Sequence, residues 1–189
     1  MKLERVLLKD KVVKKILTSE KKECREYLLR IISASTKIDI ELLRDNIELI
    51  TNDIGINKEL VNTTVDMIYK GEKEYFNIEI NYNKSHIVTV KNNIYLYNMI
   101  LRQVGREKED YIKQKYEEIY KKQDININNY DYYGIGEFIY EAEMIEKKHN
   151  IVRDKMIKVI DINLSYLDKI DYNETVNTLM ELSNLAGGV

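Results

Sequence analysis

Residues 85–104 carry the clearest pattern in this sequence, and the segments on either side of them restrict the fold. Their apolar residues recur at steps of three and four, which places them on one helix face: Ile87, Val90, Ile94, Tyr97, Leu101 and Val104. Gly105 follows where a helix C-terminus favours glycine. Residues 75–81 before the helix and 124–128 after it have strand-like sequences. The whole stretch predicts a β-α-β crossover.

A β-hairpin is predicted directly before this helix. Residues 61–69 and 75–81 alternate in polarity, and the turn-forming residues Gly71 to Lys73 lie between them. A two-residue loop at 72–73 fixes the pairing of the two strands. The pairs that it predicts are Tyr69–Phe76, Met67–Ile78 and Asp66–Glu79.

The opposed carboxylates of Asp66 and Glu79 form the candidate chemical site. Facing Cβ atoms in such a pair lie roughly 4.5–5.5 Å apart, where like charges repel. A divalent cation offsets the repulsion, and hard carboxylate oxygens suit Mg²⁺ or Mn²⁺. A register slip of one residue would separate the pair. The alternative is that Asp66 and Glu79 are ordinary polar positions on the solvent-facing side of the hairpin.

The rest of the chain predicts further helices and strands, as in an α/β domain. Residues 12–17 and 24–32 have apolar residues at helical spacing and predict an N-terminal helical pair, with Thr18-Ser19 offering N-cap chemistry for the second helix. Residues 38–50 are ambiguous between strand and helix. Alternation at 138–144 and 160–164 predicts two further strands. We therefore expect a single domain with a central mixed β-sheet flanked by helices.

The segment from residue 65 to residue 81 resembles the core of the PD-(D/E)XK nuclease superfamily, in its transposase-like, recombination-promoting branch. That branch has an aspartate at the end of one strand and later an "NIE-apolar-Q" string. Asn77-Ile78-Glu79-Ile80-Asn81 resembles this string, with asparagine in the last place. Asp10 to Ile16 is similar to the branch's "D-x-x-F-K" helix, with Lys14 at its lysine. Residues 91–97, 123–128 and 138–167 resemble later elements, so the resemblance covers about residues 8–167.

The resemblance implies a restriction-endonuclease-like core over residues 1–168. The apolar residues after it predict a short helical extension at 169–189, with a frayed or truncated end. The resemblance also implies a catalytic set of Asp66, Glu79 and Asn81, with Mg²⁺ (or Mn²⁺) held by Asp66, Glu79 and the Ile80 carbonyl. Lys14, Lys91 and Tyr95 are candidate DNA phosphate contacts, and the latter two lie on the polar side of the long helix. Asn81 replaces the lysine or glutamine of relatives, and lacks the charge of one and the reach of the other.

Composition limits the class of partner. The 30 basic and 32 acidic residues give a net charge of −2, so DNA affinity would require a local basic face.

A single cysteine, Cys24, excludes an internal disulfide and a multi-cysteine zinc site, and we expect it to be a buried thiol. No apolar run has the length of a membrane span and no signal-peptide core is present, so a cytoplasmic protein without a membrane partner is expected. The abundance of Ile, Lys, Asn and Tyr indicates a low-GC bacterial or phage genome.

The sequence thus favours a Mg²⁺-dependent DNA endonuclease that hydrolyses phosphodiester bonds. Cleavage of both strands of a duplex would need two active sites, which a homodimer would provide. The alternative is a catalytically degenerate nuclease-fold protein that binds another protein, as a regulator or a phage-type inhibitor of host defence. A structural or assembly module is the third interpretation.

His86 and His149 have no metal-ligand partners at a suitable spacing. Tyr130, Tyr132 and Tyr133 either stack bases or pack at the sheet edge.

Overall fold

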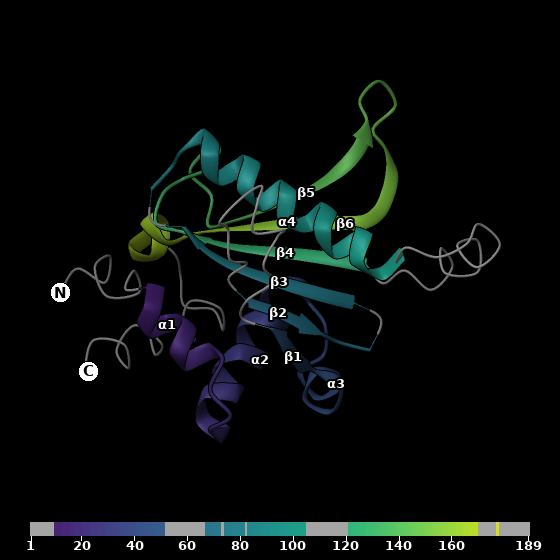
Figure 1. The fold of residues 1–189 in the computed structure, drawn as a ribbon. Coiled ribbons are helices and arrows are strands. Elements are labelled where there is room, and N and C mark those ends of the chain that lie inside the picture. The colour runs from purple at the N-terminus through teal and green to yellow at the C-terminus, as the bar shows by residue number, and fades with distance from the viewer. Residues whose placement is uncertain are drawn as a thin grey trace.

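The computed structural model describes residues 10–51, 67–72, 74–81, 83–104, 121–169 and 177. At its centre is a six-stranded mixed sheet in the order β1-β2-β3-β4-β6-β5 (Figure 1). The strands are β1 (Glu48–Thr51), β2 (Met67–Lys70), β3 (Glu74–Asn81), β4 (Lys121–Asn128), β5 (Ile139–Glu146) and β6 (Ile151–Asn163). Strands β3, β4 and β6 are parallel, whereas β1, β2 and β5 pair antiparallel with their neighbours. The expected α/β architecture with a mixed sheet is confirmed.

The predicted β-α-β crossover is also confirmed, because helix α4 (His86–Val104) connects the parallel strands β3 and β4. The ambiguous segment 38–50 divides into helix α3 (Ile40–Asn46) and strand β1. Asp39 starts α3 by accepting a 2.8 Å hydrogen bond from the backbone of Glu41. The helix ends at Ile47, where the chain becomes extended and enters β1.

The hairpin register agrees with the sequence prediction at every described pair. Tyr69 faces Phe76 and Met67 faces Ile78, and the backbone N–H of Gly71 donates to the carbonyl of Glu74 at 2.8 Å. Asp66 lies outside the described residues, so the third predicted pair is not tested. The register matters because it decides which side chains of β3 lie on each face of the sheet.

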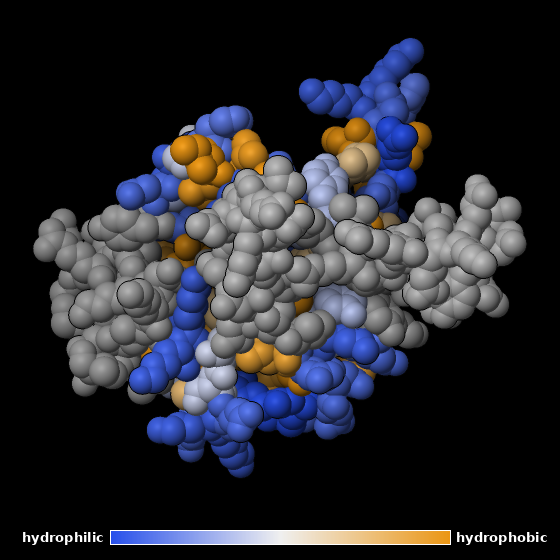
Figure 2. Space-filling model, viewed as in Figure 1, coloured by the Kyte–Doolittle hydropathy of each residue, from blue (hydrophilic) through white to orange (hydrophobic). Residues whose placement is uncertain are grey.

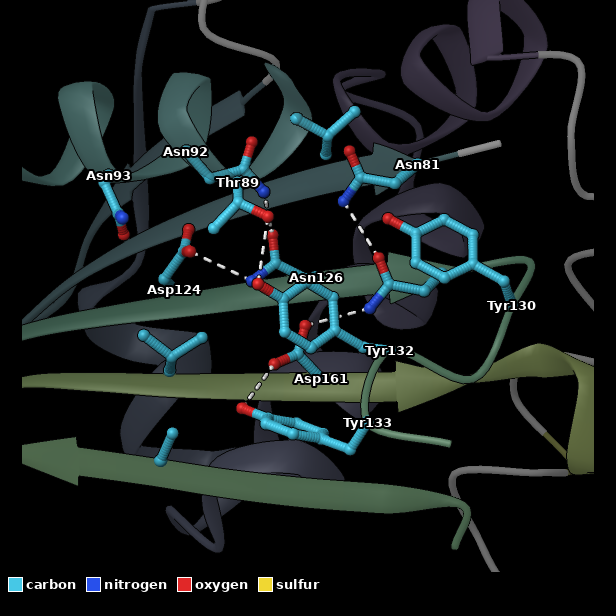
Figure 3. Close-up of a pocket in the computed structure, with 14 residues that line it drawn as sticks. Asn81, Thr89, Asn92, Asn93, Asp124, Asn126, Tyr130, Tyr132, Tyr133 and Asp161 are labelled. Atoms are coloured by element: carbon cyan, nitrogen blue, oxygen red, sulfur yellow. Dashed lines mark hydrogen bonds between the residues drawn. The ribbon is translucent and has the colours of Figure 1, made fainter. Parts of the chain in front are cut away.

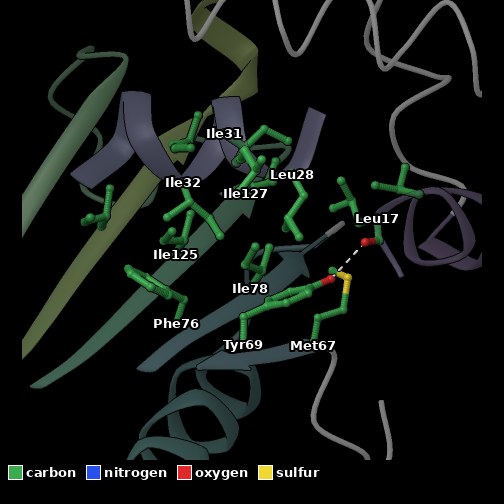
Figure 4. Close-up of a cluster of buried hydrophobic side chains, with 14 of the residues drawn as sticks. Leu17, Leu28, Ile31, Ile32, Met67, Tyr69, Phe76, Ile78, Ile125 and Ile127 are labelled. Atoms are coloured by element: carbon green, nitrogen blue, oxygen red, sulfur yellow. Dashed lines mark hydrogen bonds between the residues drawn. The ribbon is translucent and has the colours of Figure 1, made fainter. Parts of the chain in front are cut away.

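One face of the sheet is apolar and packs on helices α1 (Asp10–Leu17) and α2 (Lys22–Thr36), as Figure 4 shows. The buried residues that meet there are Leu17, Leu28, Ile31 and Ile32 from the helices and Met67, Tyr69, Phe76, Ile78, Ile125 and Ile127 from the strands. The Tyr69 hydroxyl donates to the carbonyl of Leu17 at 3.0 Å and fixes the end of α1 over β2. The predicted helical pair is confirmed, although Cys24 is half-buried rather than buried.

The predicted N-cap of the second helix is wrong, since the N-cap residue is Lys21 and no side chain caps it. The hydroxyl of Thr18 instead donates back to the carbonyl of Lys14 at 2.8 Å. The hydroxyl of Ser19 accepts a long 3.3 Å hydrogen bond from the backbone of Lys21. Both side chains therefore form hydrogen bonds with the backbone of the turn that follows α1.

Helix α4 covers the opposite face of the sheet, and three residues of its regular apolar stripe are exposed. Ile87, Val90 and Tyr97 are 77%, 41% and 57% exposed, while Asn92 and Tyr95 are buried. The side that the sequence marks as polar is therefore the packed side for these residues. Part of this side packs on apolar groups, because Tyr95 and Met99 cluster with Ile68 of β2. The rest meets polar side chains of the sheet, where Asn92 and Lys91 find their partners.

Strands β5 and β6 extend past the other strands as a two-stranded arm (Figure 1). Their turn contains His149, whose Nδ1 lies 2.9 Å from a carboxylate oxygen of Glu146. Figure 2 shows apolar side chains on the surface near the start of α4 and on this arm. After β6 the chain turns into a short 3-10 helix, η2 (Leu164–Lys169). Among the described helices, none combines the length and apolar character of a membrane-spanning segment.

Candidate functional site

The face of the sheet beneath α4 is lined by polar side chains from three adjacent strands, and we call it the polar face. Alternation along each strand turns these side chains to one side while the isoleucines between them enter the apolar core. The polar face consists of Asn77, Glu79 and Asn81 on β3, Asp124, Asn126 and Asn128 on β4, and Asp161 and Asn163 on β6. All eight are less than 5% exposed, which is unusual for polar residues and requires internal partners.

The parallel register arranges these residues in rows across the strands. Asn77 pairs with Asp124 in the first row, and Glu79 aligns with Asn126 and Asp161 in the second. The third row is Asn81, Asn128 and Asn163. The carboxyl ends of parallel strands are the common location of ligand sites in α/β sheets, and the second and third rows lie at that end.

Glu79 is completely buried and pairs with a lysine from the helix above it. The Nζ of Lys91 lies 3.1 Å from Glu79 Oε2, and the Lys91 side chain keeps 27% of its surface exposed. The same Nζ lies 5.2 Å from the centre of the Tyr95 ring. The interpretation of Glu79 as a solvent-facing polar residue is therefore wrong. Its charge is compensated from α4 within the protein.

The other sequence-predicted site residues lie in different places. Asn81 joins Glu79 on the polar face and donates to the Asn128 amide oxygen at 3.0 Å. The Ile80 side chain packs against the apolar core on the other face, as its alternation with Glu79 requires. Tyr95 is completely buried against Ile68, and the half-buried Lys14 belongs to α1 on the far face of the sheet. The structure thus brings together Glu79, Asn81, Lys91 and Tyr95 but not Lys14, and Asp66 lies outside the described residues.

Asp124 is held by amide groups at the centre of the polar face. Asn77 Nδ2 donates to Asp124 Oδ1 at 2.7 Å, and Asn126 Nδ2 donates to Asp124 Oδ2 at 3.0 Å. Burial raises the pKa of Asp124 to about 7, and the amide donors counteract only part of this effect. Asn92 of α4 continues the chain of bonds, because its Nδ2 donates to Asn126 Oδ1 at 2.6 Å.

Asp161 is a second buried carboxylate on the same face. Asn128 Nδ2 donates to its Oδ1 at 2.9 Å, and the Tyr133 hydroxyl donates to its Oδ2 at 3.4 Å. Burial raises the pKa of Asp161, and the two donors lower it in part. Burial and, to a smaller extent, the neighbouring Asp161 carboxylate raise the pKa of Tyr133 to about 12.

A loop at residues 129–138, which we call the tyrosine loop, closes over the carboxyl end of these strands. The hydroxyls of Tyr132 and Thr89 of α4 lie 2.9 Å apart, which joins the loop to the helix. Between them lies a cavity of about 230 Å³, the polar cavity (Figure 3). Its polar lining includes Asn81, Asn92, Asp124, Asn128, Asp161 and the rings of Tyr130, Tyr132 and Tyr133.

Asp131 fixes the shape of the tyrosine loop. Its carboxylate accepts hydrogen bonds from the backbone of Tyr133, Gly134 and Gly136 and from the Tyr140 hydroxyl, at 2.7–3.1 Å. Gly134 and Gly136 have φ angles of 75° and 91°, a region that favours glycine. The Gly-x-Gly pattern therefore shapes this turn, and the loop places three tyrosines at the cavity.

The sequence interpretation missed the polar cavity. The signal was present in Asp124-Ile125-Asn126-Ile127-Asn128, where polar residues alternate with isoleucine inside an interior strand. Among the described residues there is no cluster of three or more acidic, histidine or cysteine side chains suited to a metal ion. Comparison of the chain with protein-family models, with curated proteins and with solved structures gives no match.

Proposed function

We propose that the protein is a metal-dependent phosphodiester hydrolase acting on DNA, with its reaction centre at Glu79 and Asn81 of β3. The observation that carries this proposal is the contact of 3.1 Å between Lys91 and Glu79, beside Asn81 on the same face of the strand. It joins a carboxylate, a cation and an amide at the carboxyl half of an interior strand. These are the three kinds of group that phosphodiester hydrolysis uses.

The order of elements supports the proposal. A helix, an antiparallel β1-β2-β3 meander, helix α4 and a parallel strand β4 follow one another along the chain. The sequence resemblance requires such an arrangement, with Glu79 on a strand that pairs with the strand bearing the aspartate. The described register of β2 and β3 is the one on which the proposed Asp66–Glu79 pair depends.

Glu79 would provide one carboxylate ligand for a hard divalent cation, and Asp66 would provide the second. Glu79 offers a buried carboxylate, which would be a ligand together with Asp66, and the Ile80 carbonyl follows it on the strand. When bound, Mg²⁺ or Mn²⁺ would polarise the scissile phosphate and lower the pKa of the attacking water. Lys91 would then share Glu79 with the cation or turn toward the phosphate.

Lys91 also compensates for the uncharged asparagine at position 81. Relatives place a lysine or glutamine at that position, and asparagine provides neither its charge nor its reach. The Nζ of Lys91 approaches the Glu79 carboxylate from α4. A positive charge is therefore present next to the reaction centre although Asn81 is neutral. We propose that Lys91 stabilises the charge that develops on the phosphate, while the Asn81 amide orients the water.

The direct test is nicking of supercoiled plasmid in the presence of Mg²⁺ or Mn²⁺. Glu79→Gln removes the carboxylate with little change in size, and nicking should fall by at least about a hundredfold because the cation loses a ligand. Asp45→Asn on the exposed side of α3 is the matched control, since it removes one negative charge far from the polar face. Activity in Glu79→Gln equal to that of Asp45→Asn would refute the hydrolase.

A second candidate function, a protein-binding regulator without catalysis, is favoured by the exposed apolar residues of the β5–β6 arm. Met144, Ile145 and Ile151 are 49%, 45% and 59% exposed on a ribbon that extends from the sheet. Such exposure is typical of a surface that a partner covers. Inactivity of the wild type with both metals, on supercoiled, linear and single-stranded DNA, would favour this candidate.

A further inference from the structure

The polar cavity contains two carboxylates whose direct partners in the described residues are all neutral. Asp124 accepts from the amides of Asn77 and Asn126, and Asp161 accepts from the Asn128 amide and the Tyr133 hydroxyl. Asp124 is 1% exposed and Asp161 is 4% exposed. Buried carboxylates are ordinarily paired with a cation or a metal, because desolvation of an isolated charge is costly. Lys91 acts on Asp124 through its charge, but its effect is smaller than that of burial. The cavity therefore favours a ligand that carries positive charge.

The hydrogen-bond network points to the same kind of ligand, because its orientation leaves acceptors without donors. The Asp124 carboxylate accepts from Asn126 Nδ2, so Asn126 presents its oxygen to α4 and must receive a hydrogen bond from Asn92 Nδ2. This fixes the Asn92 amide with its Oδ1 unbonded among the described residues, although Asn92 is only 7% exposed. Asn92 lines the cavity. An N–H donor in the cavity would satisfy this oxygen.

The aromatic lining distinguishes an organic cation from a metal ion. Tyr130, Tyr132 and Tyr133 of the tyrosine loop line the same cavity, and Figure 3 shows the rings of Tyr130 and Tyr132 beside Asn81 and Asn126. Aromatic faces attract ammonium and guanidinium groups, and they contribute no ligand atoms to a metal except the hydroxyl. The absence of a three-membered acidic, histidine or cysteine cluster in the described parts of the chain agrees with this choice.

The size of the cavity also exceeds what an ion needs. Its volume of about 230 Å³ corresponds to roughly seven or eight water molecules at liquid density. This is below the range of roughly 300 Å³ and more that is usual for drug-sized ligands. A small amine or guanidine with its first solvent molecules fits such a space. A phosphate-bearing ligand between Asp124 and Asp161 is disfavoured, because both carboxylates would repel it.

We propose that the polar cavity binds a small organic cation, an ammonium or guanidinium compound whose N–H groups contact Asp161 and Asn92 beneath the tyrosine loop. Its positive charge compensates the Asp124–Asp161 pair, and its donors satisfy the amide oxygen that the internal network leaves unbonded. This proposal does not depend on hydrolysis of DNA. It uses residues of α4, β4, β6 and the tyrosine loop rather than the Glu79–Lys91 pair.

The experiment uses methylguanidinium as the probe and N-methylurea, which has nearly the same shape without the charge, as the matched ligand. Binding to the full-length protein is followed by NMR through the side-chain amide signals of Asn92 and Asn128. Methylguanidinium should shift both signals in a saturable manner. N-methylurea should bind at least about tenfold more weakly, because a charge-assisted contact is lost. Equal affinities for the two probes, or no saturable shift with methylguanidinium, would overturn the proposal.

Two variants locate the site. Asp161→Asn preserves the side-chain volume and removes one charge, so the affinity for methylguanidinium should fall by about tenfold. Asp45→Asn on α3 should leave this affinity unchanged. Asp124→Asn provides an independent variant if Asp161→Asn does not fold, and a similar weakening is expected. If neither charge removal weakens binding more than Asp45→Asn does, the site is elsewhere and the proposal fails.

Mg²⁺ and Mn²⁺ are tested in the same way. If Mn²⁺ broadens the Asn92 and Asn128 signals at concentrations below those at which methylguanidinium binds, and Asp161→Asn abolishes the broadening, the cavity is a metal site and the organic cation is excluded. If broadening requires Glu79 instead, the metal belongs to the hydrolase site. That result supports the hydrolase site and excludes the metal ion as the occupant of the polar cavity.

Discussion

The ammonium group of Lys91 lies 3.1 Å from the carboxylate of Glu79, a residue with no exposed surface, and this contact ties helix α4 to the interior strand β3. A carboxylate at this depth is stable in its charged form only with a compensating cation. The lysine reaches it from the helix side that the sequence marks as polar. A buried ion pair of this kind has consequences for stability as well as for catalysis.

Replacing Lys91 should destabilise the protein strongly. In Lys91→Met the buried Glu79 carboxylate loses its cation, and the free energy of unfolding should fall by about 2–4 kcal/mol, the lower part of the range reflecting the partial exposure of Lys91. The double variant Lys91→Met/Glu79→Gln should recover much of this loss. Lys148→Met, an exposed lysine in the β5–β6 turn, is the control and should change stability by less than about 0.5 kcal/mol. Urea denaturation measures all of these differences.

Asp124 makes stability depend on pH near neutrality. Its folded-state pKa is raised to about 7, above the ordinary aspartate value of the unfolded chain, so the folded protein binds more protons than the unfolded one between these two values. The contribution of Asp124 to the free energy of unfolding should therefore fall as the pH rises from about 4 to about 7, and should be constant above that range.

The variant Asp124→Asn isolates this contribution. Its melting temperature should exceed that of the wild type at pH 8, and the difference should shrink toward pH 5, where the wild-type carboxyl is protonated. Asp45→Asn should leave the wild-type pH profile unchanged, because this side chain is exposed. A wild-type profile that Asp124→Asn does not alter would show that Asp124 titrates in its ordinary range.

Helix α4 provides the clearest difference between the sequence and the structure. Its period of three to four residues predicted the helix correctly, but Ile87 and Tyr97 of the apolar stripe are exposed and Tyr95 is buried. Periodicity reports which residues share a face, whereas the chemistry of the neighbouring sheet decides which face packs. The hairpin register was predictable because only one register keeps the apolar residues of both strands together. The alternation of residues 124–128 marks β4 as a strand with a polar face, but the cavity itself was not predictable, since it combines four strands, α4 and a loop that are distant in sequence.

This orientation of α4 can be tested by substitution. Ile87→Gln and Tyr97→Gln should change the free energy of unfolding by less than about 0.5 kcal/mol, because both side chains are largely exposed. Leu96→Ala, at a position that is 3% exposed, should cost about 2–3 kcal/mol through the lost burial and the cavity left behind. Chemical denaturation of the purified variants distinguishes the two sides. Larger losses at Ile87 than at Leu96 would mean that the helix is rotated about its axis.

The two glycines of the tyrosine loop should differ in their response to alanine. At Gly134, with φ of 75° and open space around an added Cβ, the substitution should cost about 1 kcal/mol from backbone strain alone. At Gly136 the added Cβ would also lie 2.7 Å from the Tyr166 hydroxyl, so the cost should be larger, about 2 kcal/mol. Tyr166→Phe should recover part of the loss in Gly136→Ala and none in Gly134→Ala. Equal losses in all backgrounds would contradict the close approach.

The interplay of Lys91 and Asn81 separates a working hydrolase from a catalytically inactive protein. If Lys91 supplies the positive charge at the reaction centre, Lys91→Gln should lower plasmid nicking by about tenfold to a hundredfold, corresponding to the loss of a few kcal/mol of transition-state stabilisation. Asn81→Lys places a cation on the same face of β3, and it should restore activity in the Lys91→Gln background while adding little to the wild type. Asn81→Gln restores reach without charge and should not rescue Lys91→Gln. Rescue by both substitutions would assign Lys91 a steric role, and nicking that is unaffected by any of these changes would remove Lys91 and Asn81 from the reaction.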